Sequence, residues 1–190
     1  MKKLIFTLLL LLLSTDLATA YNSPRDMADV VGRNLGSKGS DWLEKKGYGH
    51  VGIYSSRKNM VLDVSDRHTG KVIQFTETSD FTSTRKKYWG ATYGIGHRGQ
   101  HNNAIRYGWR QKLYTPHYTG APLYREGKWK QKWYLSKWRW KKKWYKSRGW
   151  FRCDTFVRYC YRKATGVRLG GSNTRSVRPL KVHRALPYRR

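Results

Sequence analysis

Three short apolar runs between residues 50 and 75 constrain the fold more than any other feature of the chain. They lie in the sequence GYGHVGIYSSRKNMVLDVSDRHTGKVIQFTET and are rich in residues that favour strands. Residues 55–59 and 68–70, which separate the runs, are of the types found in turns. The pattern predicts three consecutive strands in an antiparallel meander. The sequence YWGATYGIGHRG of residues 88–99 allows one further strand.

A helix is predicted to begin at Cys153. The run CDTFVRYCYRKAT carries apolar residues at helical spacing, and Gly166 after it is typical of a helix end. We also expect a helix around residues 103–113 and a short helix next to Pro179.

Residues 24–44 are interpreted as helical too. Ser23 is a favourable residue to start a helix, and Pro24 suits the first helical position. A Gly/Ser break follows, and a second turn or helix is expected around Trp42.

The first twenty residues have the layout of a secretory signal peptide. Lys2 and Lys3 precede an apolar run over residues 4–13, and the small-residue sequence ATA ends at Ala20. We therefore expect cleavage after Ala20, a periplasmic or secreted location, and a single domain over residues 21–190. No later stretch is long or apolar enough to span a bilayer, and we expect a monomer.

The charge of the chain indicates acidic partners. Forty Lys and Arg residues face eleven Asp and Glu residues, and the formal net charge is +29. Solubility alone does not require so large an excess. Anionic cell-wall polymers, lipid headgroups, polysaccharides and nucleic acid all remain possible partners, because charge does not choose among them.

Residues 124–152 differ from the rest of the chain and are interpreted as an insert. They hold twelve Lys or Arg residues and six of the nine tryptophans. Tryptophans 129 and 133 fit helical spacing, whereas tryptophans 138 and 140 fit strand alternation, so the pattern leaves the secondary structure open. We expect the insert to hold an anionic polymer or cell-wall surface, with nucleic acid possible but without specificity. The residues expected to make this contact are Lys128, Trp129, Lys132, Trp133, Trp138, Arg139, Trp140, Lys141, Lys142, Lys143 and Trp144.

The two cysteines are expected to be free thiols. Seven residues of helix place Cys153 and Cys160 about 10 Å apart, farther than the roughly 7 Å between Cα atoms that a disulfide allows. The first turn of a helix and the neighbouring Arg152 both favour a thiolate, so Cys153 is a candidate nucleophile. The alternative is a small buried side chain, and this alternative suits Cys160 better.

A cysteine nucleophile needs a base, and His50 is the best candidate. It begins the apolar alternation HVGIY, where its ring can lie at the edge of a strand. With a turn near Arg57, Asp63 in the next strand comes close to His50 and can accept a hydrogen bond from the imidazole. An ordinary strand-end histidine and a solvent-facing aspartate are the alternatives for these two residues.

No cofactor and no metal site are expected. His97 and His101 in GHRGQH have a spacing that can bind a metal, but no third ligand of the usual type lies near them in the sequence.

The sequences GYGHVGIYSSRKNMVLDVSD and RCDTFVRYCYRKATGV together resemble the circularly permuted branch of the papain-like superfamily, which includes relatives of NlpC-type cell-wall peptidases. In unpermuted members the cysteine-bearing helix precedes the HVGIY strand, whereas here the order is reversed. Asp154 stands where a serine is usual, and Asp63 where a histidine or glutamate is often found.

The resemblance implies an α+β, papain-like permuted NlpC-type fold, with an antiparallel sheet packed against the helix that presents the nucleophile. It implies that Cys153 attacks a carbonyl group, that His50 takes and returns the proton, and that Asp63 orients His50. A tyrosine upstream of the nucleophile often assists in this family, and Tyr124 is the residue proposed for that part.

Three functions from different classes follow. The first is an exported cysteine hydrolase, a thiol peptidase or amidase that cleaves amide or peptide bonds, with cell-wall peptides as a candidate substrate and acyl transfer as a variant. The alternative is a non-enzymatic, cationic secreted protein of the same fold that binds anionic polymers. A toxin-like effector that modifies host proteins or lipids is a third, less favoured, alternative.

Overall fold

The computed structural model describes residues 24, 26–33, 49–65, 72–82, 87–91, 95–121, 124–172 and 177–189. The expected signal peptide at residues 1–20, and the turn or helix expected around Trp42, lie outside the described residues. Within those residues, no helix is both long enough and apolar enough to cross a membrane.

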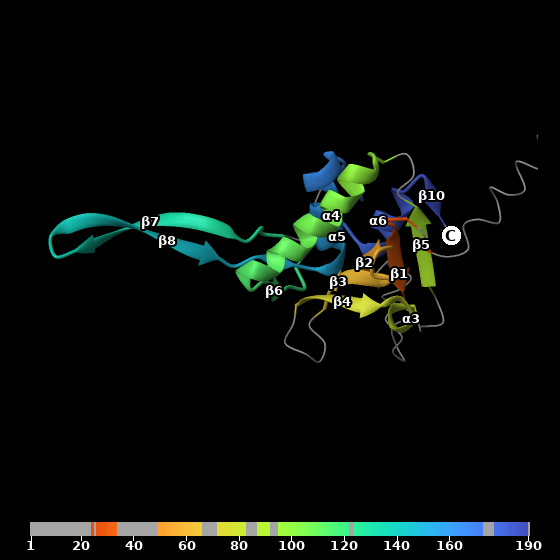
Figure 1. Ribbon diagram of the computed structural model, residues 1–190, viewed down its shortest axis with the longest axis horizontal. Helices are drawn as coiled ribbons and strands as arrows, with labels where there is room; N and C mark the ends of the chain where they lie inside the picture. Colours follow the sequence, from red (N-terminus) through yellow and green to blue (C-terminus); the bar gives the residue numbers. More distant parts are fainter. Residues whose placement is uncertain are drawn as a thin grey trace, which may run out of the picture.

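A six-stranded antiparallel sheet forms the centre of the molecule (Figure 1). Its strand order is β10-β5-β1-β2-β3-β4, and every pair is antiparallel. The predicted meander is confirmed as β2–β3–β4, and the further strand allowed by residues 88–99 is β5. The strands are β1 (Val30–Arg33), β2 (His50–Ser55), β3 (Met60–Val64), β4 (Ile73–Glu77), β5 (Lys87–Ala91) and β10 (Tyr188–Arg189).

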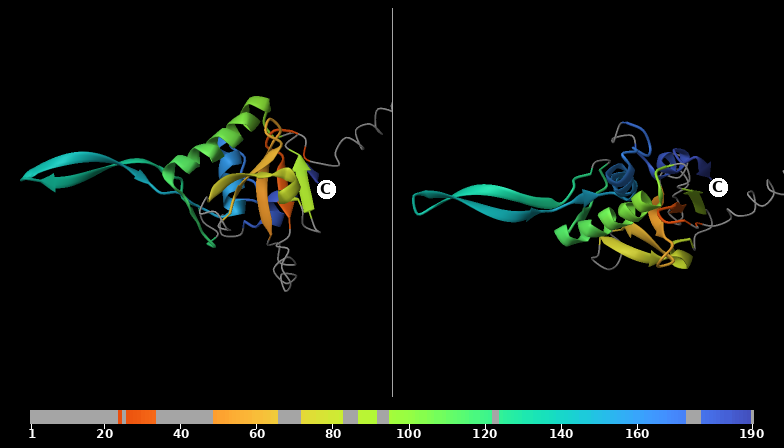
Figure 2. Two further views of the ribbon diagram at one scale, coloured as in Figure 1. Left: turned by 60° about the horizontal axis from the view of Figure 1, so that its bottom comes forward. Right: turned by 45° about the horizontal axis from the view of Figure 1, so that its top comes forward.

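The two long helices lie on one face of this sheet, which gives a mixed α+β fold. The helix that begins at Cys153 packs on β2 and β3, and a second long helix packs against it (Figure 2). The helix that begins at Cys153 ends where the sequence predicts, because Gly166 takes the left-handed conformation that closes many helices. The helical elements are α3 (Thr78–Phe81), α4 (Arg98–Arg110), the 3₁₀ turn η1 (Gln111–Tyr114), α5 (Cys153–Thr165) and α6 (Pro179–Arg184).

The helix predicted to start at Ser23 is wrong for the residues that the structure describes, because Val30–Arg33 form strand β1. Ala28 has a φ of 70°, a left-handed conformation that a right-handed helix cannot contain. The Tyr161 hydroxyl donates a hydrogen bond to the Ala28 carbonyl, which ties the start of β1 to α5. Pairing on both sides with β2 and β5 then holds the segment as a strand.

Cys160 lies in the core where α4 crosses α5. It is fully buried, and a Cβ atom on Gly108 of α4 would come within 2.8 Å of its sulfur. The absence of a side chain at Gly108 therefore allows the two helices to approach each other closely. This contact assigns Cys160 a packing role, as the sequence suggested.

The insert forms a long two-stranded hairpin, which resolves the secondary structure that the sequence left open. β7 (Lys128–Ser136) pairs antiparallel with β8 (Arg139–Ser147) along their full length. The hairpin projects from one end of the molecule in all three views (Figures 1 and 2). At its base, β6 (His117–Tyr118) runs parallel to β9 (Trp150–Phe151).

A network of hydrogen bonds, buried at Gln111 and partly exposed at Glu126, fixes the base of the hairpin to α5. Gln111 donates a hydrogen bond to the Tyr159 hydroxyl at 2.9 Å and accepts one from the Gly127 amide at 2.8 Å. The Tyr159 hydroxyl donates to Glu126 at 2.9 Å, and Glu126 also forms an ion pair with Lys163. The hairpin therefore starts from a rigid support on the same helix that carries Cys153.

Candidate active site

His50 and Asp63 form the hydrogen-bonded pair that the sequence predicts. His50 Nε2 lies 2.8 Å from Asp63 Oδ2, and the Asp63 side chain is 2% exposed. Because a carboxylate accepts hydrogen bonds, the pair holds the imidazole with its proton on Nε2 and its lone pair on Nδ1. Nδ1 is then the ring nitrogen that can receive a proton.

Asp63 is held in place from β4 as well. The Thr76 hydroxyl donates a hydrogen bond to Asp63 Oδ1 at 2.8 Å, and the Gln74 side-chain amide donates to the Thr76 hydroxyl at 3.4 Å. Both carboxylate oxygens of Asp63 are therefore occupied, one by His50 and one by Thr76. This arrangement fixes the direction from which Asp63 meets the imidazole.

Gly52 of β2 leaves room for the pair, because it has no side chain. A Cβ atom on Gly52 would lie 2.5 Å from Val61 Cγ1 and 3.1 Å from Asp63 Cβ. Any side chain at this position would therefore push β3 away from β2. The glycine in HVGIY thus permits the close approach that brings Asp63 to His50.

The pair lies on the face of the sheet that points away from α5. Side chains alternate along a strand, so His50 shares a face with Tyr54, and Asp63 shares the same face with Val61. Tyr54 and Val61 pack with Phe81 of α3, and the His50 ring lies 5.2 Å from the Phe81 ring. The alternate residues of the two strands, Val51 and Ile53 on β2 and Leu62 on β3, face α5 instead.

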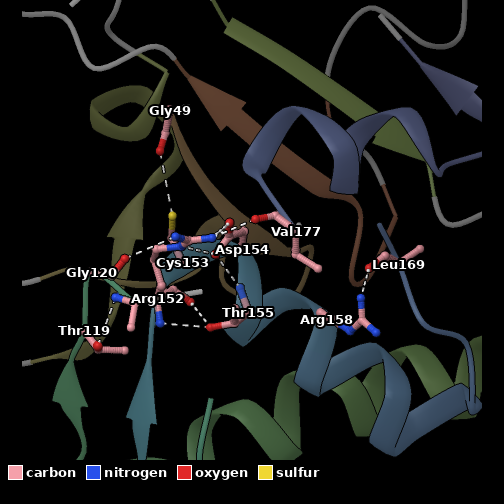
Figure 3. A network of polar contacts seen from close by, with 11 residues as sticks. Gly49, Thr119, Gly120, Arg152, Cys153, Asp154, Thr155, Arg158, Leu169 and Val177 are labelled. Carbon is pink, nitrogen blue, oxygen red and sulfur yellow. Dashed lines mark hydrogen bonds and ion pairs between the residues drawn. The ribbon is translucent and has the colours of Figure 1, made fainter. Parts of the chain in front are cut away.

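The Cys153 thiol lies against the main chain of β2 on both sides of His50. Sγ donates a hydrogen bond to the Gly49 carbonyl over 3.8 Å, and the Val51 amide donates one to Sγ. Figure 3 shows the contact with Gly49 at the start of α5. The first turn of a helix also has amides without partners inside the helix, which makes this a favourable place to stabilise an oxyanion.

β2 and β3 separate at this point, which leaves room for the thiol beside the main chain of β2. The ladder between the two strands ends at the pair Ile53–Leu62. The main-chain groups of Tyr54 bond on the β1 side, so those of Gly49 and Val51, which alternate with it, point toward β3. The thiol therefore approaches the end of this ladder from the face of the sheet that α5 covers. The imidazole contacts Asp63 of β3 on the opposite face.

An ion pair fixes the start of α5. Arg152 donates two hydrogen bonds to Asp154, each of 2.7 Å, and a third of 2.7 Å to the Val177 carbonyl (Figure 3). The Thr155 amide donates to Asp154 at 2.7 Å. Asp154 is fully buried, so its charge depends on these partners. The sequence treats Arg152 as a free charge beside the thiol, but in the structure Asp154 neutralises it.

Burial sets the ionisation of Cys153 more strongly than the helix N-terminus does. The residue is 2% exposed. Burial, and then the charge of Asp154, raise the pKa of the thiol to about 12, while the Val51 amide and Arg152 lower it by less. The expectation of a lowered pKa is therefore wrong for this conformation, because a thiolate would lose its hydration and face a carboxylate. Cys153 is a protonated thiol at neutral pH, and its attack on a substrate requires a base.

The raised pKa of Cys153 predicts a loss of stability in alkali. The folded chain keeps the thiol proton up to about pH 12, whereas an unfolded cysteine releases it near pH 8.5. This contribution to stability is complete below about pH 8.5 and decreases as the pH rises toward 12, by about 1.4 kcal/mol per pH unit. Urea unfolding of the wild type and of Cys153→Ser across this range should give a steeper decrease for the wild type. Equal slopes would contradict the assignment.

Tyr124 has no described contact with the nucleophile. Arg162 donates a hydrogen bond to its hydroxyl at 3.1 Å, and its ring stacks on Phe151 with the centroids 6.2 Å apart. Arg162 lies nine residues beyond Cys153, which is about 13 Å along the helix. Among the described residues, the contacts of Tyr124 give no support to a part beside Cys153.

One residue of the site, Thr76, was not found from the sequence. Thr76 could have been found, because alternation along β4 places it on the same face as Asp63.

The described residues contain no group of three His, Cys, Asp or Glu side chains that could hold a metal. The His101 ring bonds to the Ile95 carbonyl at 2.7 Å. His97 and Gln100 form a capping box at the start of α4. His97 and His101 therefore both have structural contacts within the chain.

Comparison with protein-family models, with curated proteins and with solved structures finds no match for the chain. The resemblance to permuted papain-like proteins therefore stays a prediction from the quoted sequences.

Proposed function

We propose that this protein is an exported cysteine hydrolase of the permuted papain-like type that cleaves amide or peptide bonds, with cell-wall peptides as its substrate class. One observation carries the proposal. The Cys153 thiol contacts the main chain on both sides of His50, and Asp63 holds the Nε2 of that histidine. The nucleophile of α5 thus lies against the strand segment that carries the base, and the carboxylate of β3 orients that base.

The groups support a general-base mechanism. Cys153 Sγ attacks the carbonyl carbon while its proton moves to His50 Nδ1, and amides at the start of α5 stabilise the oxyanion. The proton then passes from Nδ1 to the leaving nitrogen, the carbon–nitrogen bond breaks, and a thioester remains. Water, deprotonated by His50, hydrolyses the thioester to a carboxylic acid and restores the thiol. Asp63 stabilises the imidazolium in both halves of the reaction.

Hydrolysis of cell-wall fragments tests the proposal. The purified chain is incubated with muropeptides and with model peptide amides, and the products are identified by mass spectrometry. The proposal expects new carboxyl and amine ends from a single bond type. Intact substrates after long incubation at several pH values would count against it.

The alternative, a non-enzymatic cationic binding protein, is favoured by one specific observation. The Cys153 thiol is buried and protonated, as a packing cysteine would be. This alternative predicts retention on anionic polymers without turnover of any amide. The same incubation separates the two functions, because only the hydrolase yields new ends.

A further inference from the structure

The hairpin β7–β8 has two chemically different faces. Paired residues share a face of the hairpin. The register places four tryptophans in a row on one face, and they come from β7 and β8 in turn. Trp129 and Trp133 lie on β7, and Trp140 and Trp144 lie on β8 beside them, with Leu135 opposite Trp140. Successive tryptophans are two residues apart along the axis, or about 7 Å. We call this row the aromatic face.

Contacts within the hairpin confirm this arrangement. The Lys142 ammonium lies 4.6 Å from the centroid of the Trp133 ring, and the Lys146 ammonium 5.4 Å from that of Trp129. Both lysines are the cross-strand partners of the tryptophans that they cover. They therefore belong to the aromatic face as well.

The other side of the hairpin is the cationic face. The twenty residues 128–147 carry nine Lys or Arg and no Asp or Glu. Two of the nine lie on the aromatic face and one in the turn, so six point from the opposite side. These six residues are Lys128, Lys130, Lys132, Arg139, Lys141 and Lys143. Tyr134 and Tyr145 lie among them.

Nothing in the described part of the molecule covers the aromatic face. Its four tryptophans are between 51% and 68% exposed, and Leu135 is 56% exposed. So many large apolar side chains in one exposed row are unusual on a protein that functions without a partner surface. At the tip of the hairpin, Trp138 is 94% exposed.

The turn that presents Trp138 is strained. Lys137 and Trp138 have φ values of 46° and 66°, the left-handed conformations of a type I′ turn, in which asparagine and glycine are usual. Bulky side chains cost free energy in these conformations. A tryptophan held at the tip in spite of this cost indicates that the indole has a use there.

We propose that the hairpin binds the interface of an anionic lipid bilayer, with its aromatic face directed into the headgroup region. Tryptophan is enriched at this level of a membrane, where its ring is partly buried and its N–H stays hydrated. An anionic leaflet also attracts the nine positive charges, at about 1 kcal/mol for each one near the surface.

The separation of the two faces favours a bilayer over a single-stranded nucleic acid. A strand stacked on the tryptophans would reach only Lys142 and Lys146, since the six other cations point away from it. A bilayer is a continuous charged plane that extends beyond both edges of the narrow ribbon. Long lysine side chains can bend around these free edges toward the phosphates while their Cβ atoms stay on the far face.

A matched pair of double variants tests the proposal in the full-length chain. Trp133→Ser/Trp144→Ser removes two rings from the aromatic face, and Tyr134→Ser/Tyr145→Ser removes the two neighbouring rings from the cationic face. The probe is a vesicle of equimolar phosphatidylcholine and phosphatidylglycerol, and pure phosphatidylcholine vesicles serve as the uncharged control. Partition is measured by co-sedimentation and by the blue shift of tryptophan fluorescence.

The proposal expects the tryptophan variant to lose at least about tenfold in partition to the anionic vesicles, and the tyrosine variant to lose less than about twofold. Partition of the wild type should decrease with salt and be weak on the uncharged vesicles. Equal losses in the two variants, or no loss in either, would overturn the proposal. So would vesicles that bind no protein while oligo-dT binds in a way that depends on Trp133 and Trp144. Circular dichroism of both variants checks that the fold is kept.

Discussion

Cys153→Ala is expected to abolish hydrolysis, with a loss of at least about 10³-fold in kcat/KM. The side chain supplies the atom that attacks the carbonyl carbon, and no other described thiol lies at that place. Cys160, the second cysteine of the chain, is fully buried two turns farther along α5. The expected loss therefore comes from chemistry and not from the loss of a thiol in general.

Cys160→Ala is the matched control for this variant. It removes a thiol from the same helix and leaves a small cavity next to Gly108, so it should reduce stability but leave turnover unchanged. Product formation is followed by mass spectrometry for both variants. Undiminished hydrolysis by Cys153→Ala would refute the assignment of the nucleophile.

Asp154→Ala is expected to destabilise the protein more than any other single substitution at the site, by about 3–5 kcal/mol. The carboxylate is fully buried, and it accepts two hydrogen bonds from Arg152 and one from the Thr155 amide. Its removal leaves a guanidinium only 12% exposed without its counter-charge. Urea unfolding monitored by circular dichroism measures the effect.

The ion pair between Lys163 and Glu126 provides the control for this prediction. Its partners are 44% and 34% exposed, so solvent screens their interaction. Lys163→Ala should therefore cost less than about 1 kcal/mol. Similar losses of unfolding free energy for the two variants would contradict the prediction, because the buried pair would then contribute no more to stability than the exposed pair.

The sheet and α5 could be predicted because short-range patterns determine them. The turn between Ser55 and Met60 fixes the register of β2 and β3, and this register places Asp63 diagonal to His50. Gly166 similarly marks the end of α5. Both features depend on residues close together in the sequence, so the His50–Asp63 pair follows from local sequence patterns alone.

Other features depend on contacts that the sequence does not show. The sequence predicts a helix where β1 forms because Pro24 suits a helix start, while the pairing of β1 with β2 and β5 comes from distant segments. The secondary structure of the hairpin is ambiguous in the sequence because neither face of the hairpin packs on the core. Burial therefore imposes neither the helical nor the strand period on its tryptophans. The pKa of Cys153 is predicted in the wrong direction because burial by β2 is a property of the folded chain.

Acylation of the intact chain by p-nitrophenyl acetate tests the central claim most directly, because it needs no knowledge of the natural substrate. Peptide mass spectrometry locates the acetyl group and measures its rate of transfer in the wild type and in His50→Ala. The account predicts an acetyl thioester on Cys153, formed at least about a hundredfold more slowly in His50→Ala. Acetylation of Cys153 at the same rate in both proteins, or none in the wild type, would contradict it.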